Sequence, residues 1–191
     1  RRGALAGVAD CDGAPLPVEH LALTDVALTG TDAAATITLL GPDGDVRHES
    51  LTLRVAAPGL HTVLDAAAAW AAAVEATGLA GGRAVADALE GFSGAGRRFE
   101  LVGEADEVRV VDDYAHNPTK VASTLAAGRL AAGEGRGVAL FQPALFTRTR
   151  DFAEEFALAL DAADAVVVCD VFGSREDPID GVTSALITDA E

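Results

Sequence analysis

One turn in the second half of the chain constrains the fold most: residues 112–116, with the sequence DDYAH. It follows a mostly hydrophobic run, 108–111, that predicts a short buried strand. Asn117 and Pro118 come directly after it, and these residue types commonly begin a helix as its N-cap and its first residue. The turn is therefore predicted to connect a strand to a helix, which is where an open α/β sheet binds its ligands.

The predicted turn brings together two carboxylates, a phenol and an imidazole, those of Asp112, Asp113, Tyr114 and His116. The helix N-terminus behind it favours anions, so the cluster suits a nucleotide or a phosphorylated group. The same residues also allow a structural interpretation, in which Asp113 and Asn117 cap the turn and His116 forms an ordinary loop hydrogen bond. The spacing alone does not decide between the two.

Strand and helix patterns alternate from residue 108 onward. The predicted strands are 108–111, 137–142 and 165–170, and the predicted helices are 118–132 and 149–163. Short loops between alternating elements indicate a parallel sheet with right-handed crossovers. The last helix is predicted to face the core with Phe152, Phe156 and Leu160, and 166–169 has the pattern of a fully buried strand.

Arginines follow the ends of the predicted parallel strands, at Arg148, Arg150 and Arg175. Because the carboxyl ends of parallel strands meet at one edge of a sheet, we expect these side chains to converge with His116 on one rim. Arg148 is the main candidate for holding an anion through two parallel hydrogen bonds. Its alternative role is a surface ion pair with an acidic neighbour.

The first half of the chain has a different pattern. Residues 18–55 contain three runs of alternating hydrophobic residues, with a strong turn signal at 41–44, and predict an antiparallel meander. Helices are predicted over 65–76 and over 83–92, the second with an apolar stripe formed by Val85, Ala88, Leu89 and Phe92. Glycines at 91, 94 and 96 predict a flexible hinge, so we place a domain boundary near 96–106.

Charge and composition exclude several classes of partner. The 191 residues carry a formal net charge of −16, which argues against binding to nucleic acid or to an anionic membrane. No continuous apolar stretch reaches the roughly 18 residues of a membrane-spanning helix. Cys11 and Cys169 form no C-x-x-C pair, which indicates a reducing, cytoplasmic compartment. An anionic ligand must then be held by a few well-placed arginines.

The sequence DDYAHxPT at 112–119 resembles the signature that opens the C-terminal domain of the Mur ligases, the ATP-dependent amino-acid ligases of peptidoglycan precursor synthesis. Further segments are similar to the family members that join L-alanine to UDP-N-acetylmuramate. These segments are GRRFE at 96–100, FQP at 141–143, TRTR at 147–150, REDP at 175–178 and GVTS at 181–184. The resemblance is specific from about residue 58 onward.

The resemblance implies a ligase reaction in two steps. A carboxylate of UDP-N-acetylmuramate attacks the γ-phosphate of ATP to give an acyl phosphate, and the amine of L-alanine then displaces phosphate. ATP and Mg²⁺ are the implied cofactors, and cell wall biogenesis, cell shape and cell division are the implied processes. No metal ligand is assigned within this chain, and its oligomeric state stays open.

The resemblance also implies roles for seven residues. ATP is expected to contact His61, Arg97, Arg98, Asp113 and Tyr114, whereas the amino acid and the acyl phosphate are expected to contact His116 and Arg148. The chain departs from the family pattern elsewhere. Thr62 and Asp65 stand where asparagines approach the adenine, Asn117 and Ala144 stand where histidines occur, and Leu145 follows Ala144. Thr62 has the alternative role of a helix N-cap.

The implied fold class is α/β. An antiparallel meander plus helices, the remnant of the central ATPase domain in residues 1–100, precedes a truncated Rossmann-like parallel-sheet C-terminal domain in residues 101–191. One alternative is a related Mur-type amino-acid or peptide ligase, such as the one that recycles cell-wall tripeptide. Another is a non-catalytic relative that binds a metabolite.

The phosphate-binding loop of such a ligase is missing from this sequence. Lys120 is the single lysine, and no G-x-x-x-x-G-K-[ST] motif occurs. The chain also opens with Arg1, Arg2 and Gly3 and contains no methionine. We therefore expect an internal fragment of a longer protein, which on its own is inactive.

Overall fold

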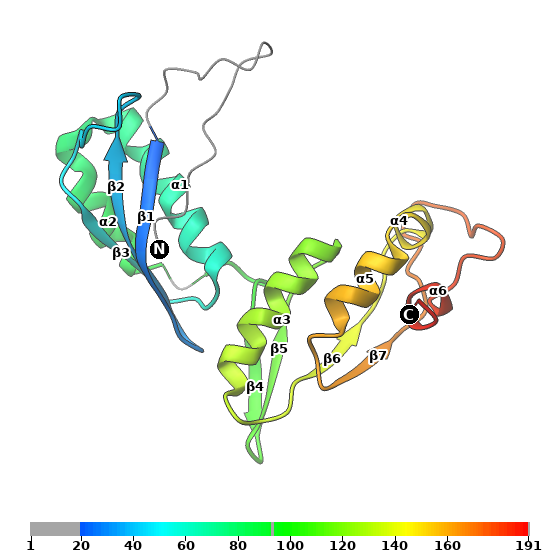
Figure 1. Ribbon diagram of the computed structural model, residues 1–191. Coiled ribbons are helices and arrows are strands. Elements are labelled where there is room, and N and C mark those ends of the chain that lie inside the picture. Colours follow the sequence, from blue (N-terminus) through cyan, green and yellow to red (C-terminus); the bar gives the residue numbers. More distant parts are fainter. Residues whose placement is uncertain (1–19, 93, 191) are drawn as a thin grey trace, which may run out of the picture. The chain divides into compact units, whose positions relative to one another are not determined.

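The computed structural model describes residues 20–92 and 94–190. The chain divides into two compact units, residues 1–93 and 94–191 (Figure 1). The predicted α/β class is confirmed, since antiparallel and parallel strand pairs both occur together with helices. No helix in the described ranges is long and apolar enough to cross a membrane.

The first unit contains the predicted antiparallel meander. Its strands are β1 (His20–Leu28), β2 (Ala33–Leu40) and β3 (Leu51–Val55), hydrogen-bonded in that order. In β3 the residues alternate strictly between buried and exposed, as expected of a sheet with one face in the core. The predicted turn before β3 contains Gly44, whose φ of 85° favours glycine.

Two helices cover this sheet: α1 (Leu60–Thr77) and α2 (Gly82–Glu90), joined by a short 3-10 turn, η1 (Leu79–Gly81). Trp70 is almost fully buried between them, and its Nε1–H donates to the carbonyl oxygen of Gly82 at 2.8 Å. A Cβ atom on Gly82 would lie 3.0 Å from the Trp70 ring. Glycine therefore allows the close approach of the two helices.

Four details predicted for these helices are wrong. α1 begins at Leu60, before the predicted start at residue 65, and Gly59 occupies the N-cap position. Thr62 is therefore inside the first turn, where its hydroxyl donates to the carbonyl oxygen of Pro58 at 2.8 Å instead of capping the helix. α2 ends at Glu90, so Phe92 lies outside the helix, and its side chain is 49% exposed. Ala88 is also exposed, since the buried residues of α2 are Gly82 and Ala86.

The second unit contains four strands in two separate sheets. β4 (Glu100–Ala105) and β5 (Val108–Asp112) form an antiparallel hairpin, whereas β6 (Val138–Phe141) and β7 (Ala165–Val168) pair in parallel. The prediction of β5 as part of the parallel sheet is therefore wrong. The boundary between the two units lies between residues 93 and 94, just before the predicted 96–106, and residues 100–105 form β4. Hydrogen bonds to β5 stabilise this strand, and the strand propensity of residues 100–105 did not indicate that pairing.

Helices α3 (Pro118–Ala132) and α5 (Ala153–Leu160) pack against each other and against one face of the β6–β7 pair. The predicted bounds of α3 are confirmed. The predicted helix 149–163 is divided into α4 (Phe146–Asp151) and α5, because Phe152 leaves the helical conformation between them. A short helix, α6 (Ala185–Thr188), completes the unit.

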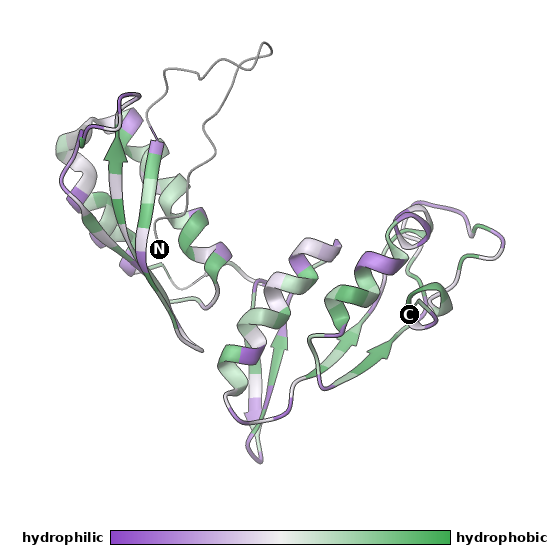
Figure 2. Cartoon of the chain, viewed as in Figure 1, coloured by the Kyte–Doolittle hydropathy of each residue, from purple (hydrophilic) through white to green (hydrophobic). Residues whose placement is uncertain are grey.

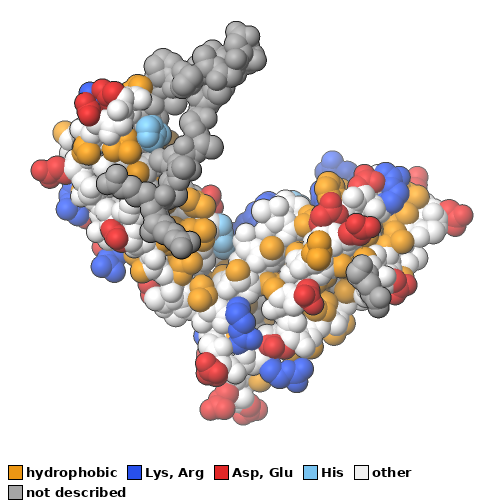
Figure 3. Space-filling view, in the orientation of Figure 1, with side chains coloured by type: hydrophobic (Ala, Val, Ile, Leu, Met, Phe, Trp, Pro, Cys, Tyr) orange, Lys and Arg blue, Asp and Glu red, His pale blue; other side chains and the backbone are white. Residues whose placement is uncertain are grey.

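Burial in this unit was overestimated from the sequence. Phe156 and Leu160 are in the core as predicted, but Phe152 is 44% exposed. β5 and the centre of β7 are also exposed rather than buried, and Figure 2 shows their hydrophobic character. In β6, Ala139 and Phe141 are buried while Leu140 is 74% exposed, because α3 and α5 cover one face only. Figure 3 shows apolar side chains reaching the surface.

Asp164, just before β7, ties the end of α3 to the β6–β7 pair. It accepts hydrogen bonds from the backbone N–H of Gly137 at 2.6 Å and from Arg129 Nη1 at 2.9 Å. The Gly137 hydrogen bond, followed by the charge of Arg129, holds the pKa of this carboxyl below its usual range. α3 is thereby held at its C-terminal end, and its N-terminus adjoins the turn 112–116.

Candidate functional site

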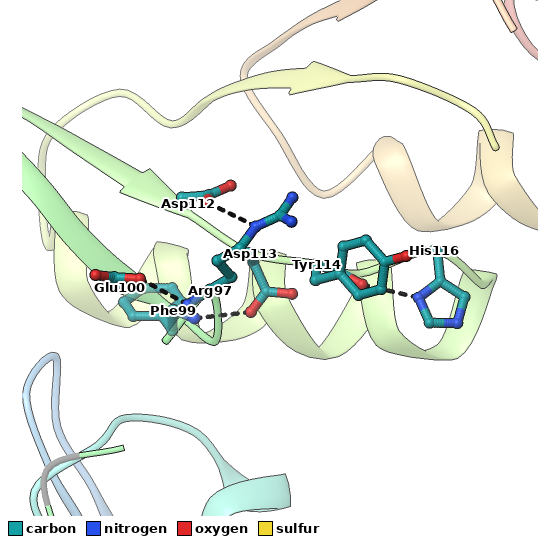
Figure 4. A network of polar contacts seen from close by, with 7 residues as sticks. All are labelled: Arg97, Phe99, Glu100, Asp112, Asp113, Tyr114 and His116. Carbon is teal, nitrogen blue, oxygen red and sulfur yellow. Dashed lines mark hydrogen bonds and ion pairs between the residues drawn. The ribbon is translucent and has the colours of Figure 1, made fainter. Parts of the chain in front are cut away.

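The candidate site lies where residues 97–99, here called the arginine loop, meet residues 112–116, here called the acidic turn. Two backbone groups join them. The N–H of Tyr114 donates to the carbonyl oxygen of Arg97 at 2.9 Å, and the N–H of Phe99 donates to Oδ2 of Asp113 at 2.8 Å (Figure 4). Residues 113 and 114, directly after β5, therefore hold the loop at both of its ends.

The arginine loop has a backbone conformation that needs this support. Arg97 and Phe99 have φ angles of 56° and 49°, in the left-handed region that residues other than glycine rarely adopt. Each such residue costs about 1–3 kcal/mol. The N–H of Arg97 donates to the Glu100 carboxylate at 2.6 Å, and its Nε donates to Asp112 Oδ2 at 3.3 Å. Carboxylates around the loop thus offset the strain with charge-assisted hydrogen bonds.

Both arginines of the loop lie close to the ring of Tyr114. The guanidinium carbon of Arg97 lies 4.9 Å from the centre of the ring, and that of Arg98 lies 5.9 Å from it. Both distances are within the range of a cation–π interaction. Tyr114 is 53% exposed, so this pair of positive charges stands next to a ring surface that a ligand can reach.

His116 is oriented by the same turn. Its Nδ1 lies 2.9 Å from the carbonyl oxygen of Tyr114, and the two rings are 5.1 Å apart between centres. A carbonyl oxygen only accepts, so Nδ1 carries the proton in this hydrogen bond. Nε2 is then the ring nitrogen left for other partners.

The structural alternative for the acidic turn is confirmed in part. Asn117 caps α3, since its side chain accepts a hydrogen bond from the N–H of Lys120 at 2.9 Å. Asp113 does not cap this helix. Its carboxylate holds the arginine loop through Phe99, which lies 14 residues earlier in the sequence.

An open cavity of about 430 Å³ lies at the N-terminus of α3, and none of residues 112–116 lines it. Its lining includes two cations, Lys120 and Arg148, one anion, Glu155, and the exposed ring of Phe152. Arg148 Nη1 also donates to the carbonyl oxygen of Ala144 at 3.4 Å. Asn117, the residue after His116, lines this cavity with Arg148, whereas His116 is not among its lining residues, so the convergence of Arg148 with His116 on one rim stays a prediction.

The other two arginines of the predicted rim do not line this cavity. Arg150 Nε donates to Asp151 at 2.7 Å, and that hydrogen bond holds the pKa of Asp151 below its usual range. Arg175 is exposed. His61, the remaining predicted residue, is half-buried in the first turn of α1 and belongs to the first unit.

Asp112, which the sequence placed in the candidate cluster, forms a hydrogen bond with Arg97 Nε. Two further residues of this region had no role assigned from the sequence: Glu100, which accepts from the N–H of Arg97, and Lys120, which lines the cavity with Arg148. Lys120 stands out in the sequence as the single lysine of an acidic chain. Over the described residues, no group of three or more His, Cys, Asp or Glu side chains is placed to hold a metal ion.

Comparisons with known proteins point in one direction. Residues 97–191 match the family model "Mur ligase, glutamate ligase domain". The chain is similar to the UDP-N-acetylmuramate--L-alanine ligase of Kineococcus radiotolerans, with 53% identity over 169 residues that cover 88% of this chain and 35% of the relative. The ligase of the same name from Paenarthrobacter aurescens is 48% identical over 98% of this chain and 42% of its own length.

Two solved structures are similar to the fold. UDP-N-acetylmuramate-alanine ligase MurC from Thermotoga maritima matches with a TM-score of 0.66 and 28% identity, over 89% of this chain and 34% of that one. A murein peptide ligase from Psychrobacter arcticus matches with a TM-score of 0.56 and 22% identity, over 89% of this chain and 33% of that one, which shows the fold alone. The chain spans 35% and 42% of the two curated relatives named above.

Proposed function

The chain belongs to the Mur ligase family, and from this premise we propose that it is part of an ATP-dependent ligase that joins L-alanine to UDP-N-acetylmuramate. The observation that carries the proposal is the arrangement of Arg97 and Arg98 around the exposed ring of Tyr114. In a chain with a net charge of −16, two guanidinium groups gathered on one aromatic ring form a site for an anionic, aromatic ligand. A nucleotide has both properties.

We propose that Arg97, Arg98 and Tyr114 contact the nucleotide directly. Guanidinium groups bind phosphate oxygens or ribose hydroxyls through fixed, planar donors. Asp113 then serves the nucleotide site indirectly, because its carboxylate holds the arginine loop through Phe99. The contact of His61 with the adenine side remains a prediction.

We propose that Arg148 and His116 serve the amino acid and the acyl phosphate. Arg148 lines the cavity at the N-terminus of α3, where its guanidinium can bind a carboxylate or an acyl phosphate bidentately. Because Nδ1 of His116 is engaged by Tyr114, Nε2 is the ring nitrogen that faces the incoming amine in this proposal. Ala144 has no side chain able to share these tasks, so Arg148 contributes more of the charge neutralisation that such a reaction needs.

ATP supplies the phosphoryl group that activates the carboxylate, and the described residues fit its binding through the arginine loop. Mg²⁺ is the metal we expect with ATP. The described residues include no cluster suited to a metal ion, so we assign it to the nucleotide phosphates and to protein groups outside this sequence. We assign residues 1–100 to the latter part of the central ATP-binding domain and residues 101–191 to the C-terminal domain. The cytoplasm is the proposed compartment.

The test is substrate-dependent phosphate release by the protein extended to the full length of its relatives. Release is expected with ATP, UDP-N-acetylmuramate and L-alanine together, and not when any of the three is omitted. Activity with a cell-wall tripeptide in place of L-alanine would support the alternative peptide ligase. Failure to bind ATP would support a non-catalytic relative. The 191-residue chain alone is expected to show no release, because it lacks a phosphate-binding loop.

A further inference from the structure

Residues 143–147, which lead into α4, are joined to residues 172–176 by four hydrogen bonds. Two are between backbones: Phe172 N–H donates to Pro143 O at 2.8 Å, and Leu145 N–H donates to Phe172 O at 2.9 Å. The other two end on one carboxylate. The N–H of Thr147 donates to Glu176 Oε2 at 2.9 Å, and its hydroxyl donates to Glu176 Oε1 at 2.6 Å.

The two segments also pack closely. A Cβ atom on Gly173 would lie 2.7 Å from Cε2 of Phe146 and 2.9 Å from the carbonyl oxygen of Glu176, so a larger residue cannot be accommodated there without movement. Leu145, the N-cap residue of α4, has a φ of 73° and no side-chain group that can cap the helix. α4 therefore begins in a strained conformation that its own sequence does not stabilise.

Glu176 supplies what the N-cap residue lacks. Both of its carboxylate oxygens bind Thr147, the second residue of the helix, and so satisfy one of the free N–H groups at its start. Arg148 is the next residue, and it lines the cavity at the N-terminus of α3. Glu176 is not among the residues that line this cavity, so it acts on the cavity through the residues it holds.

We propose that Glu176 is a positioning residue for Arg148: by holding Thr147 through both carboxylate oxygens, it orients the first turn of α4 so that the guanidinium faces the cavity. This inference rests on the proposed function, because it assumes that Arg148 binds the amino acid or the acyl phosphate. The Thr147 hydrogen bonds and the nearby positive charge of Arg148 also lower the pKa of Glu176, in agreement with a carboxylate that stays ionised in this contact.

The test uses the full-length protein and measures kcat and the KM for L-alanine. Glu176→Gln is expected to lower kcat/KM by at least about tenfold, because an amide cannot accept two hydrogen bonds through two oxygens. Asp177→Asn removes the same charge from the exposed neighbouring residue and is expected to stay within about twofold of the unchanged protein. Thr147→Val, which replaces the hydroxyl with a methyl group, should lower kcat/KM. Thr147→Ser keeps the hydroxyl and should keep kcat/KM close to that of the unchanged protein.

A double substitution separates positioning from a merely structural role. If Glu176 acts through Arg148, then Glu176→Gln causes little further loss in a protein that already carries Arg148→Lys. If Glu176→Gln lowers kcat/KM by the same factor in the unchanged protein and in the Arg148→Lys protein, the inference is overturned. Normal kinetics of Glu176→Gln would overturn it as well. Should Glu176→Gln fail to fold, the Thr147→Val and Thr147→Ser pair decides in the same way.

Failure of the proposed function would look different. If Arg148→Lys itself has normal kinetics, the assignment of Arg148 to the substrate is wrong, and the inference is overturned with it. If Arg148→Lys is impaired but Glu176→Gln is normal, the inference alone is overturned and the proposed role of Arg148 stands.

Discussion

The carboxylate of Asp113 accepts a 2.8 Å hydrogen bond from the backbone N–H of Phe99, and this contact joins the acidic turn to the arginine loop. Phe99 has a positive φ, so its N–H is presented from a conformation that is costly in isolation. Asp113→Ala should therefore destabilise the second unit by about 1–3 kcal/mol and weaken ATP binding, because the partner N–H is left unsatisfied. Urea unfolding and nucleotide titration measure the two effects.

The control for Asp113→Ala is Glu134→Ala. Glu134 is exposed in the same unit, and the described part of the chain includes no hydrogen bond to its side chain. Its replacement should change the free energy of unfolding by no more than about 0.5 kcal/mol. Equal stability and ATP affinity for Asp113→Ala and Glu134→Ala would show that Asp113 does not hold the loop.

Tyr114 is predicted to organise Arg97 and Arg98 through its ring and not through its hydroxyl. Tyr114→Phe should keep ATP affinity within about twofold, whereas Tyr114→Leu should weaken it by roughly threefold or more, since each cation–π contact at an exposed site is worth about 0.5–1 kcal/mol. Titration with a non-hydrolysable ATP analogue measures both. Equal weakening by the two substitutions would instead assign the contribution to the hydroxyl group.

Arg148→Lys is predicted to reduce turnover or raise the L-alanine requirement by at least about tenfold, equivalent to about 1.4 kcal/mol, with nearly unchanged thermal stability. A lysine offers a point charge where the guanidinium offers two parallel donors. The sequence alone allowed an ion pair of Arg148 with Asp151 or Glu154. In the structure Asp151 pairs with Arg150 instead, with 2.7 Å between Arg150 Nε and Asp151 Oδ1.

Arg150→Lys is therefore the matched control for Arg148→Lys. It lies two residues away on the same short helix, and its ion pair with Asp151 is about half exposed, so it should contribute little to stability and nothing to turnover. Normal kinetics of Arg148→Lys together with impaired kinetics of Arg150→Lys would move the anion-binding role to Arg150.

The contact of Glu176 with Thr147 predicts a dependence of stability on pH. The pKa of Glu176 is lowered in the folded protein from its ordinary value of 4.5, first by the side-chain hydrogen bond from Thr147. A lowered folded-state pKa means that its contribution is fully present above the unfolded-state pKa and is lost as the pH falls through the folded-state pKa. The charged groups nearby are Arg148 and Arg150.

The measurement compares the unfolding temperatures of the unchanged chain and Glu176→Gln across this range. At pH 7 the unchanged chain should unfold at a higher temperature, and the difference should shrink as the pH falls below 4.5. A difference that stays constant down to the acid limit would mean that ionisation of Glu176 does not contribute to the contact.

The sequence by itself determined the local elements whose signals lie within a few residues. Asn117 and Pro118 specify the start of α3 through a cap and a fixed φ, and strict alternation over 51–55 specifies β3. The two groups of residues that form the candidate site, the arginine loop and the acidic turn, were also recognisable, because their motifs resemble those of a known family.

Only the tertiary structure decided how these residues act on one another. β4 pairs with β5, which burial patterns did not predict because both strands are largely exposed. Asp113 holds Phe99 across 14 residues, and Glu176 holds Thr147 across 29. Such contacts depend on the path of the backbone between the partners. A carboxylate at the end of a strand can contact a ligand, cap a helix or hold a distant loop, and its residue type is the same in all three cases.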